Sequence, residues 1–281
     1  MPLPLSPLSL LRKTTAPRRA ALALLVAACT AFAAAPAAAQ ALQSRLFDVT
    51  KSKKLPVCIY PLYYAISFRD TKTNTLSGLD VDLAKELAKE LGAEVEFVES
   101  GFGTFIADLQ ANKCVIGMFA LGVTTKRAQA VEFSKPYLNA SVYAVARKGG
   151  KVRTWADIDK PDTKVAVLLG SYIETFMKGY LKKASIVSIQ PPSTRESELA
   201  ASRVDAILVD YPTVLRVKQE FDWAISVDPG QKLAPTPVAY AVPQGDQIWL
   251  NYINQFIDII KLDGRLAATA KKYQLDANVA P

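Results

Sequence analysis

Arg127 stands at a position where a side chain could bind an anion. It belongs to a short helical segment that follows the apolar strand 115–121, with Thr124 as a good N-cap. A guanidinium there points toward the crevice in which open α/β sheets bind ligands, and its planar fork can meet a carboxylate through two hydrogen bonds. Taken alone, the residue types favour an ordinary surface ion pair between Arg127 and Glu132.

A second candidate for anion binding is the predicted helix start at Ser171. The apolar strand 164–169 ends at Gly170, and Ser171 with Glu174 has the spacing of a capping box. The N–H groups of such a helix start, that of Tyr172 included, are suited to a carboxylate. Good capping alone explains the pattern equally well.

Asp210 is the candidate for binding a cation. It follows the predicted strand 204–209 and directly precedes Tyr211, where a helix is expected to begin. Its carboxylate could cap that helix, or it could pair with a ligand's ammonium group, which needs an opposite charge once water is excluded. An arginine, a helix start and an aspartate together could hold both charged groups of a zwitterionic amino acid.

The composition excludes several classes of function. The 281 residues include no histidine, which rules out a Ser-His-Asp triad, histidine acid/base chemistry and a histidine-ligated metal. The three cysteines are too scattered for a zinc cluster, and we predict neither a metal nor a cofactor. The net charge of +8 falls to +4 without residues 1–39, and no dense basic stripe remains, so nucleic-acid binding is not expected.

Residues 1–39 have the composition of a signal peptide. Four basic residues precede an apolar run from Ala20 to about Ala35, and small residues follow up to Gln40. The alternative is a lipoprotein signal in which Cys29 carries the lipid, and we favour cleavage. No later segment is long and apolar enough to cross a bilayer, so we expect a periplasmic protein. In that compartment Cys58 and Cys114 could form a disulfide or remain buried thiols, and the sequence favours neither.

Apolar strands alternate with amphipathic helices along most of the remaining chain, which is typical of a parallel α/β fold. One helix has Leu83, Leu87 and Leu91 on a single stripe, with Asp80 as its expected cap and Gly92 as its end. The other predicted strands and helices cover residues 55–59, 94–98, 105–109, 142–147, 154–158, 185–189, 193–202, 238–242 and 266–273, with a long helix that Asp246 caps and residues 262–264 break.

Residues 78–91 resemble the signature segment of the family-3 bacterial extracellular solute-binding proteins, the amino-acid receptors of ABC importers. The order glycine, apolar, acidic, apolar, acidic, apolar matches position by position, and the apolar helix stripe follows. The resemblance extends over nearly the whole mature chain, with further similar segments at residues 60–63, 124–127, 133–137 and 204–210.

This resemblance implies an α/β, two-lobed periplasmic binding protein fold of type II. Each lobe would be a mainly parallel sheet flanked by helices, and two crossover strands would form the hinge. The first lobe would comprise residues 40–146 and 238–281, and the second lobe residues 147–237.

The resemblance also implies a set of ligand-binding residues. Arg127, Ser171, Tyr172 and Asp210 would bind the charged groups, and the pocket wall would include Tyr60, Tyr63, Phe102, Ala120 and Gly122. Tyr60 replaces the acidic residue of receptors for basic amino acids, which favours neutral, apolar or aromatic ligands. Three departures leave the substrate class open. Gly122 replaces a usual Ser or Thr, residues 120–122 replace Gly-Met-Thr, and residues 64–65 replace Pro-Pro.

The resemblance implies a monomeric periplasmic receptor that closes on an amino acid and delivers it to an inner-membrane ABC permease with its ATPase. One alternative is a secreted cyclohexadienyl dehydratase-like enzyme on the same fold, with Asp210, Glu174 or a tyrosine as its general acid. Another is a subunit that presents its closed form to a sensor kinase. We expect no enzymatic activity, because nothing in the sequence marks a placed acid.

Overall fold

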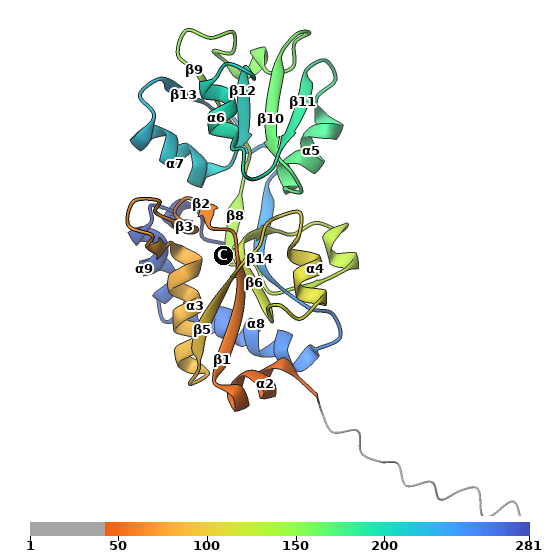
Figure 1. Cartoon of the computed structure of the whole chain (residues 1–281), viewed down its shortest axis with the longest axis vertical. Coiled ribbons are helices and arrows are strands. Elements are labelled where there is room, and N and C mark those ends of the chain that lie inside the picture. The colour runs from red at the N-terminus through yellow and green to blue at the C-terminus, as the bar shows by residue number, and fades with distance from the viewer. Residues whose placement is uncertain (1–42) are drawn as a thin grey trace, which may run out of the picture. The chain divides into compact units, whose positions relative to one another are not determined.

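Two separate β-sheets organise residues 43–281, the part of the chain that the computed structural model describes (Figure 1). The predicted signal peptide and Cys29 lie outside these residues. We call the first sheet with its helices lobe 1 and the second sheet with its helices lobe 2. Each lobe has apolar side chains packed between its strands and its helices.

Lobe 1 contains a mixed sheet in the order β5-β1-β6-β14-β7, with β8 also paired to β14. Strands β1, β5 and β6 run parallel, and β14 is antiparallel to β6. The strands are β1 (Lys54–Ile59), β5 (Glu94–Glu99), β6 (Ile116–Gly122), β7 (Glu132–Phe133), β8 (Leu138–Ala140) and β14 (Thr236–Val242). A small separate sheet comprises β2 (Leu62–Tyr63), β3 (Ser67–Arg69) and β4 (Leu76–Ser77).

Helices from both ends of the described chain surround the lobe 1 sheet, as Figure 1 shows. They are α2 (Arg45–Ser52), α3 (Leu79–Glu90), α4 (Phe105–Gln110), α8 (Gln247–Leu262), α9 (Arg265–Lys272) and the 3-10 helices η1 (Arg127–Gln129) and η3 (Asp276–Asn278). None of the helices in residues 43–281 is long and apolar enough to cross a membrane.

Lobe 2 contains a five-stranded sheet in the order β11-β10-β12-β9-β13. Its strands are β9 (Tyr143–Arg147), β10 (Lys164–Leu168), β11 (Ser185–Ile189), β12 (Ala206–Val209) and β13 (Ala224–Val227). Its helices are η2 (Trp155–Asp157), α5 (Tyr172–Tyr180), α6 (Arg195–Ala200) and α7 (Tyr211–Glu220). Strands β10, β11 and β12 run parallel, so α5 and α7 begin where their carboxyl ends meet.

The chain passes between the lobes twice, after β8 and before β14 (Figure 1). The two passages touch, because the N–H of Val142 donates to the carbonyl of Leu233 at 3.0 Å. Strand β9 pairs with β12 and β13, so residues 143–146, which were predicted as the end of lobe 1, belong to lobe 2. Strand β14 already pairs with β8 at Thr236, so the return to lobe 1 also comes earlier than residue 238.

The N-cap of helix α3 differs from the prediction, and tertiary contacts of Asp80 explain the difference. Gly78, not Asp80, is its N-cap, and a Cβ on Gly78 would lie 2.3 Å from the carbonyl of Ile66. Asp80 is fully buried, where its carboxylate accepts hydrogen bonds from the N–H of Ala120 at 2.7 Å and the hydroxyl of Tyr137 at 2.6 Å. Asp80 therefore ties α3 to strand β6.

Cys58 and Cys114 form a disulfide in the core of lobe 1, with their Cα atoms 5.5 Å apart. Cys58 lies in β1, and Cys114 lies just before β6, the neighbouring parallel strand. The bond links positions 56 residues apart in the chain. Closing a loop of that length stabilises a fold by about 4 kcal/mol on the chain-entropy argument.

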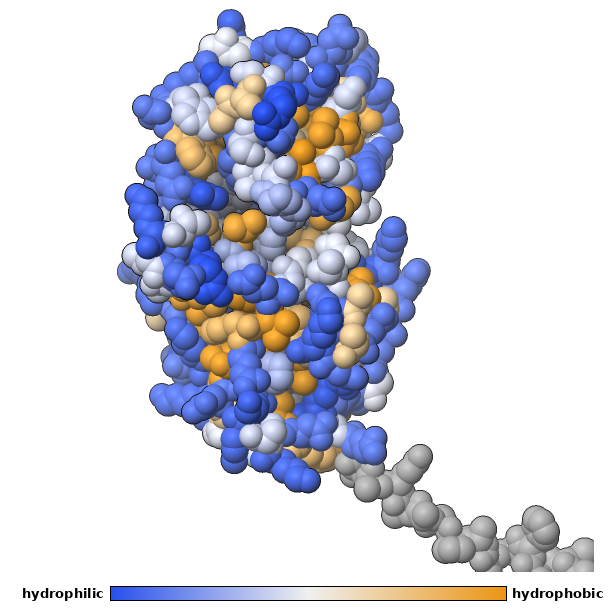
Figure 2. Space-filling model, viewed as in Figure 1, coloured by the Kyte–Doolittle hydropathy of each residue, from blue (hydrophilic) through white to orange (hydrophobic). Residues whose placement is uncertain are grey.

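Hydrophilic side chains cover most of the face shown in Figure 2, and hydrophobic ones show in the hollowed band between the two lobes. Scattered exposed apolar residues are ordinary, but apolar side chains in a hollow mark the place where a small molecule can bind.

Candidate functional site

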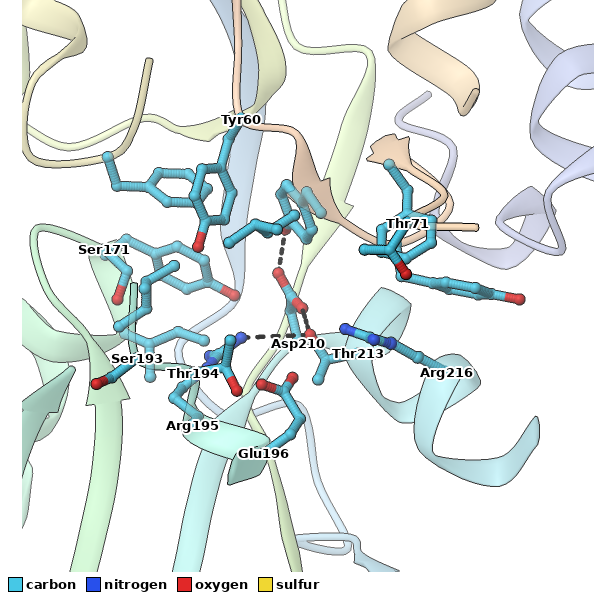
Figure 3. Close-up of a pocket in the computed structure, with 18 residues that line it drawn as sticks. Tyr60, Thr71, Ser171, Ser193, Thr194, Arg195, Glu196, Asp210, Thr213 and Arg216 are labelled. Atoms are coloured by element: carbon cyan, nitrogen blue, oxygen red, sulfur yellow. Dashed lines mark hydrogen bonds between the residues drawn. The ribbon is translucent and has the colours of Figure 1, made fainter. Parts of the chain in front are cut away.

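A cavity of about 190 Å³ lies between the lobes. Lobe 1 contributes an aromatic wall, and lobe 2 contributes the start of α5, the start of α6 and the start of α7. In Figure 3, Asp210 lies at the centre, with Tyr60 on one side and Arg195 and Glu196 on the other. Six of the nine predicted ligand-binding residues line this cavity: Tyr60, Tyr63, Phe102, Ser171, Tyr172 and Asp210.

Asp210 presents its carboxylate to the cavity and does not cap α7. It stands at the N-cap position, but its side chain accepts no hydrogen bond from the helix backbone. Instead it accepts one from the hydroxyl of Tyr63 in lobe 1 and one from Oγ1 of Thr213 at 3.1 Å. It is 6% exposed, and no Lys or Arg nitrogen of residues 43–281 lies within 4.0 Å of it. The interpretation of Asp210 as a simple cap is therefore wrong.

Arg127 is buried between the lobes but does not line the cavity. Its Nη1 donates to the carbonyl of Gly122 in lobe 1 at 2.7 Å, and its Nη2 donates to the carbonyl of Gly170 in lobe 2 at 2.8 Å. The guanidinium carbon lies 5.2 Å from the ring centre of Phe105 and 5.8 Å from that of Phe102. Phe102 lines the cavity and Arg127 does not, so the arrangement differs from our prediction that the guanidinium points toward the crevice.

Arg127 is also a buried cation without a countercharge. It is 7% exposed, and in residues 43–281 no carboxylate oxygen lies within 4.0 Å of it. The expected surface pair with Glu132 is absent from these residues, so that interpretation is wrong. Burial lowers the pKa of Arg127 to about 10, which leaves it charged at neutral pH.

The start of α5 opens into the cavity with its cap in place. Oγ of Ser171 accepts the N–H of Glu174 at 3.1 Å. The carboxylate of Glu174 accepts the N–H of Gly170 at 2.6 Å instead of that of Ser171, so the predicted capping box is not reciprocal. Burial opposes ionisation of Glu174, but its hydrogen bonds from Lys178, Ser188 and Gly170 hold its pKa below the usual value. An ionised Glu174 is unsuited to act as a general acid.

Three aromatic side chains of lobe 1 form one wall of the cavity. The ring centres of Tyr60 and Phe102 are 5.5 Å apart, and those of Tyr63 and Phe102 are 5.7 Å apart, both with edge-to-face geometry. Burial and the charge of Asp210 raise the pKa of Tyr63 well above its usual value, so its hydroxyl stays a donor. This wall suits the apolar part of a small ligand.

Gly122 is explained by its contact with Tyr172. A Cβ on Gly122 would lie 2.9 Å from Cδ1 of Tyr172, so a Ser or Thr there would displace the tyrosine ring. Gly122 lies outside the cavity wall, beneath this ring. Ala120 lines a smaller adjoining hollow together with Tyr63 and Asp210.

Several polar residues of the cavity were not predicted from the sequence. They are Thr71, Ser193, Thr194, Arg195, Glu196, Thr213 and Arg216. The sequence analysis placed these positions only within a predicted helix at residues 193–202, and in the structure the capping box lies between Thr194 and Ser197. The signal that could have found them is their position after β11, because all strand ends at this edge of a parallel sheet face the same crevice.

The fold and the cavity define the class of protein: two α/β lobes, joined by two crossing segments and enclosing a cavity, form a type II periplasmic binding protein. The sequence matches the family of bacterial extracellular solute-binding proteins, family 3, over residues 55–276, and the chain belongs to this family. The resemblance noted in the sequence and the fold class are both confirmed.

Individual relatives are of two kinds. The chain is 26% identical over 200 residues to the L-cystine-binding protein of Escherichia coli K12, covering 70% of this chain and 74% of that protein. It is 27% identical over 241 residues to the cyclohexadienyl dehydratase of Pseudomonas aeruginosa, covering 85% and 89%. A solved structure of an ancestral amino acid-binding protein, a precursor of cyclohexadienyl dehydratase, superposes with a TM-score of 0.75 at 33% identity and covers 82% of this chain and 99% of that chain.

Proposed function

We propose that this chain is the periplasmic substrate-binding component of an ABC importer and that it captures an amino acid in the cavity between its lobes. One observation carries the proposal: the described residues bury a guanidinium, Arg127, and a carboxylate, Asp210, and neither has a countercharge within 4.0 Å. A buried charge without a partner is costly. An amino acid brings an ammonium, which can pair with Asp210 directly, and a carboxylate, which can bind at the start of α5 next to the carbonyl of Gly170 that Arg127 holds.

Each end of the zwitterion has a suitable receiver. The ammonium pairs with Asp210, which already accepts hydrogen bonds on both carboxylate oxygens and has room for further donors. The α-carboxylate binds at the start of α5, through Oγ of Ser171 and the N–H groups that follow it. Arg127 lies close to the start of α5, because it donates a hydrogen bond to the carbonyl of Gly170 immediately before the helix. Its positive charge there favours binding of the ligand's carboxylate.

Closing of the lobes couples binding to recognition by the transporter. Among residues 43–281, three side-chain hydrogen bonds join the lobes: Tyr63 with Asp210, Arg127 with the carbonyl of Gly170, and Tyr64 with Gln219. A ligand that completes the charges of both lobes shifts the population toward this closed form. The closed form is the shape that the permease and its ATPase subunit would accept. The protein acts as a monomer and not as an enzyme.

A thermal-shift screen of residues 40–281 against the common amino acids and small carboxylates tests the proposal. We expect at least one amino acid to raise the melting temperature, because a ligand that binds only the folded state stabilises it by mass action. The same compound as its N-acetyl derivative, which lacks the ammonium charge, serves as a matched control and is expected to give no shift. A flat profile across all the amino acids would overturn the proposal.

The dehydratase relative gives a second candidate function, because it covers 85% of this chain. An enzyme would need a protonated acid facing the cavity. Glu174 lies outside the cavity wall and is held ionised, which leaves Asp210 and Glu196 as the carboxyl groups in the wall. Turnover of prephenate or arogenate by the purified protein, lost in Glu196→Gln or Asp210→Asn, would establish this activity.

A further inference from the structure

Arg195 is a cavity residue for which the binding of the α-amino and α-carboxyl groups gives no role. It is the first residue of α6, directly after the N-cap Thr194, and it lines the cavity beside Asp210 (Figure 3). Its Nη1 donates to the carbonyl of Leu208 at 2.9 Å, and its Nη2 lies 3.5 Å from Oγ1 of Thr213. These contacts fix the guanidinium in place and leave other N–H groups for a ligand, because a guanidinium has five.

The charge of Arg195 has no partner in the described residues. No carboxylate oxygen of residues 43–281 lies within 4.0 Å of it, although Glu196 is its neighbour in the chain. Most arginines of the described chain do have such a partner. The exceptions besides Arg195 are Arg127, Arg147 and Arg153, and none of these lines the cavity. Arg195 is therefore a fixed cation in the cavity wall, where an anionic group of a ligand can bind.

The positive charge of Arg195 outweighs the negative charge of Glu196 at the cavity wall. Burial raises the pKa of Tyr60, and there the lowering effect of Arg195 is larger than the raising effect of Glu196. Burial raises the pKa values of Tyr63 and Tyr172 most strongly, and the charge of Asp210 raises them further. The charge of Arg195 lowers both pKa values. Next to Tyr60 the charge of Arg195 therefore has the larger effect, whereas Asp210 has the larger effect next to Tyr63 and Tyr172.

We propose that Arg195 binds a carboxylate at the end of the ligand's side chain, so that the site selects an acidic amino acid. This inference rests on the proposed function, in which Asp210 holds the ammonium and the start of α5 holds the α-carboxylate. Thr213 links the two groups, since its Oγ1 donates to Asp210 at 3.1 Å and lies 3.5 Å from Arg195. Asp210 and Arg195 are therefore neighbours, which suits a ligand with a short side chain. Tyr60 would then face the apolar part of that side chain.

Matched ligand pairs test the assignment directly. Calorimetry of the wild type with L-glutamate against L-glutamine, and with L-aspartate against L-asparagine, compares a carboxylate with a neutral amide of nearly the same shape. We expect one acid to bind at least about tenfold more tightly than its amide, because a charge-assisted bond to a fixed guanidinium is stronger than a bond to a neutral amide. Arg195→Gln is expected to remove that preference and to leave amide binding within about threefold.

Arg153→Gln is the matched control, because Arg153 is exposed, carries the same charge and lies away from the cavity. It is expected to keep the preference for the acid. An unchanged melting temperature of ligand-free Arg195→Gln shows that the variant folds.

Three results would overturn the assignment. The amides could bind as tightly as the acids, none of the four compounds could bind, or Arg195→Gln could weaken acid and amide alike, which would place the α-carboxylate on Arg195. The proposed function is tested separately. It stands after any of these results if another amino acid binds and Asp210→Asn abolishes that binding.

Discussion

At the scale of single residues, the site depends on charges that the fold buries without pairing them. Arg127 and Asp210 are each less than a tenth exposed, and each keeps hydrogen bonds to neutral groups only. Hydrogen bonds hold such a charge in place but do not neutralise it. A ligand of opposite charge therefore gains more here than at an exposed site, where solvent screens the interaction.

Replacing Arg127 by alanine is expected to weaken binding of the amino acid found in the screen by about 1–3 kcal/mol, because the carbonyl groups of Gly122 and Gly170 lose a charged donor beside the carboxylate site. Arg127→Lys retains the charge but not the two directed bonds to Gly122 and Gly170, so it should lose less. Calorimetry measures both variants, and circular dichroism checks their folding. Equal affinity of wild type and Arg127→Ala would show that Arg127 has no part in binding.

Asp80 predicts an unusual dependence of stability on pH. Burial raises its pKa to about 7, so the folded protein holds a proton that the unfolded chain, with a pKa near 3.8, has already released. Stability therefore falls as pH rises through 7 and levels off at about one pH unit above it. We expect the free energy of unfolding to drop by about 2–3 kcal/mol between pH 5 and 7.

Urea unfolding at pH 5, 6, 7 and 8 measures this effect. The chain has no histidine, so few other side chains titrate in this range. Stability that is flat or rises from pH 5 to 7 would contradict the raised pKa of Asp80.

At the scale of elements, local sequence patterns predicted most strands and helices of both lobes but not their side-chain contacts. The stripe of Leu83, Leu87 and Leu91 is buried against the sheet, as its helical spacing indicates. Asp80 has the residue type of an N-cap, but residues far away in the chain surround it, and sequence spacing carries no information about them. The short strands β2, β3, β4, β7, β8 and β13 were missed, because two to four residues show too little periodicity.

The disulfide is an element-scale prediction, because it joins two neighbouring strands. Changing Cys58 and Cys114 together to serine should lower the free energy of unfolding by about 4 kcal/mol, since the unfolded chain regains the entropy of an open loop. Urea unfolding of the double variant measures the loss. The reduced wild type is the control and should show a loss of similar size. A double variant as stable as the oxidised wild type would contradict a stabilising bond.

At the scale of the whole molecule, the two passages between lobes decide which charges can meet. The sequence placed them a few residues late, because β9 and β14 are continuous strands whose sheet membership depends on partners distant in the chain. The predicted residues Asp210 and Ser171 line the cavity. Arg195 and Thr213 also line it, but they do so because the fold places the starts of α6 and α7 side by side. Residue types at strand ends thus predicted the site in part, and closure of the lobes determined the rest.

Affinity of the Asp210→Asn variant is the most direct test of amino-acid capture. Asparagine keeps the size of the side chain but removes the charge that the ammonium needs. Calorimetry with the amino acid found in the screen should show binding weakened by at least about 1–3 kcal/mol. Asp222→Asn, an exposed change in the same lobe, should bind as the wild type does. If Asp210→Asn binds as tightly as the wild type, the ammonium is held elsewhere and the proposed site is wrong.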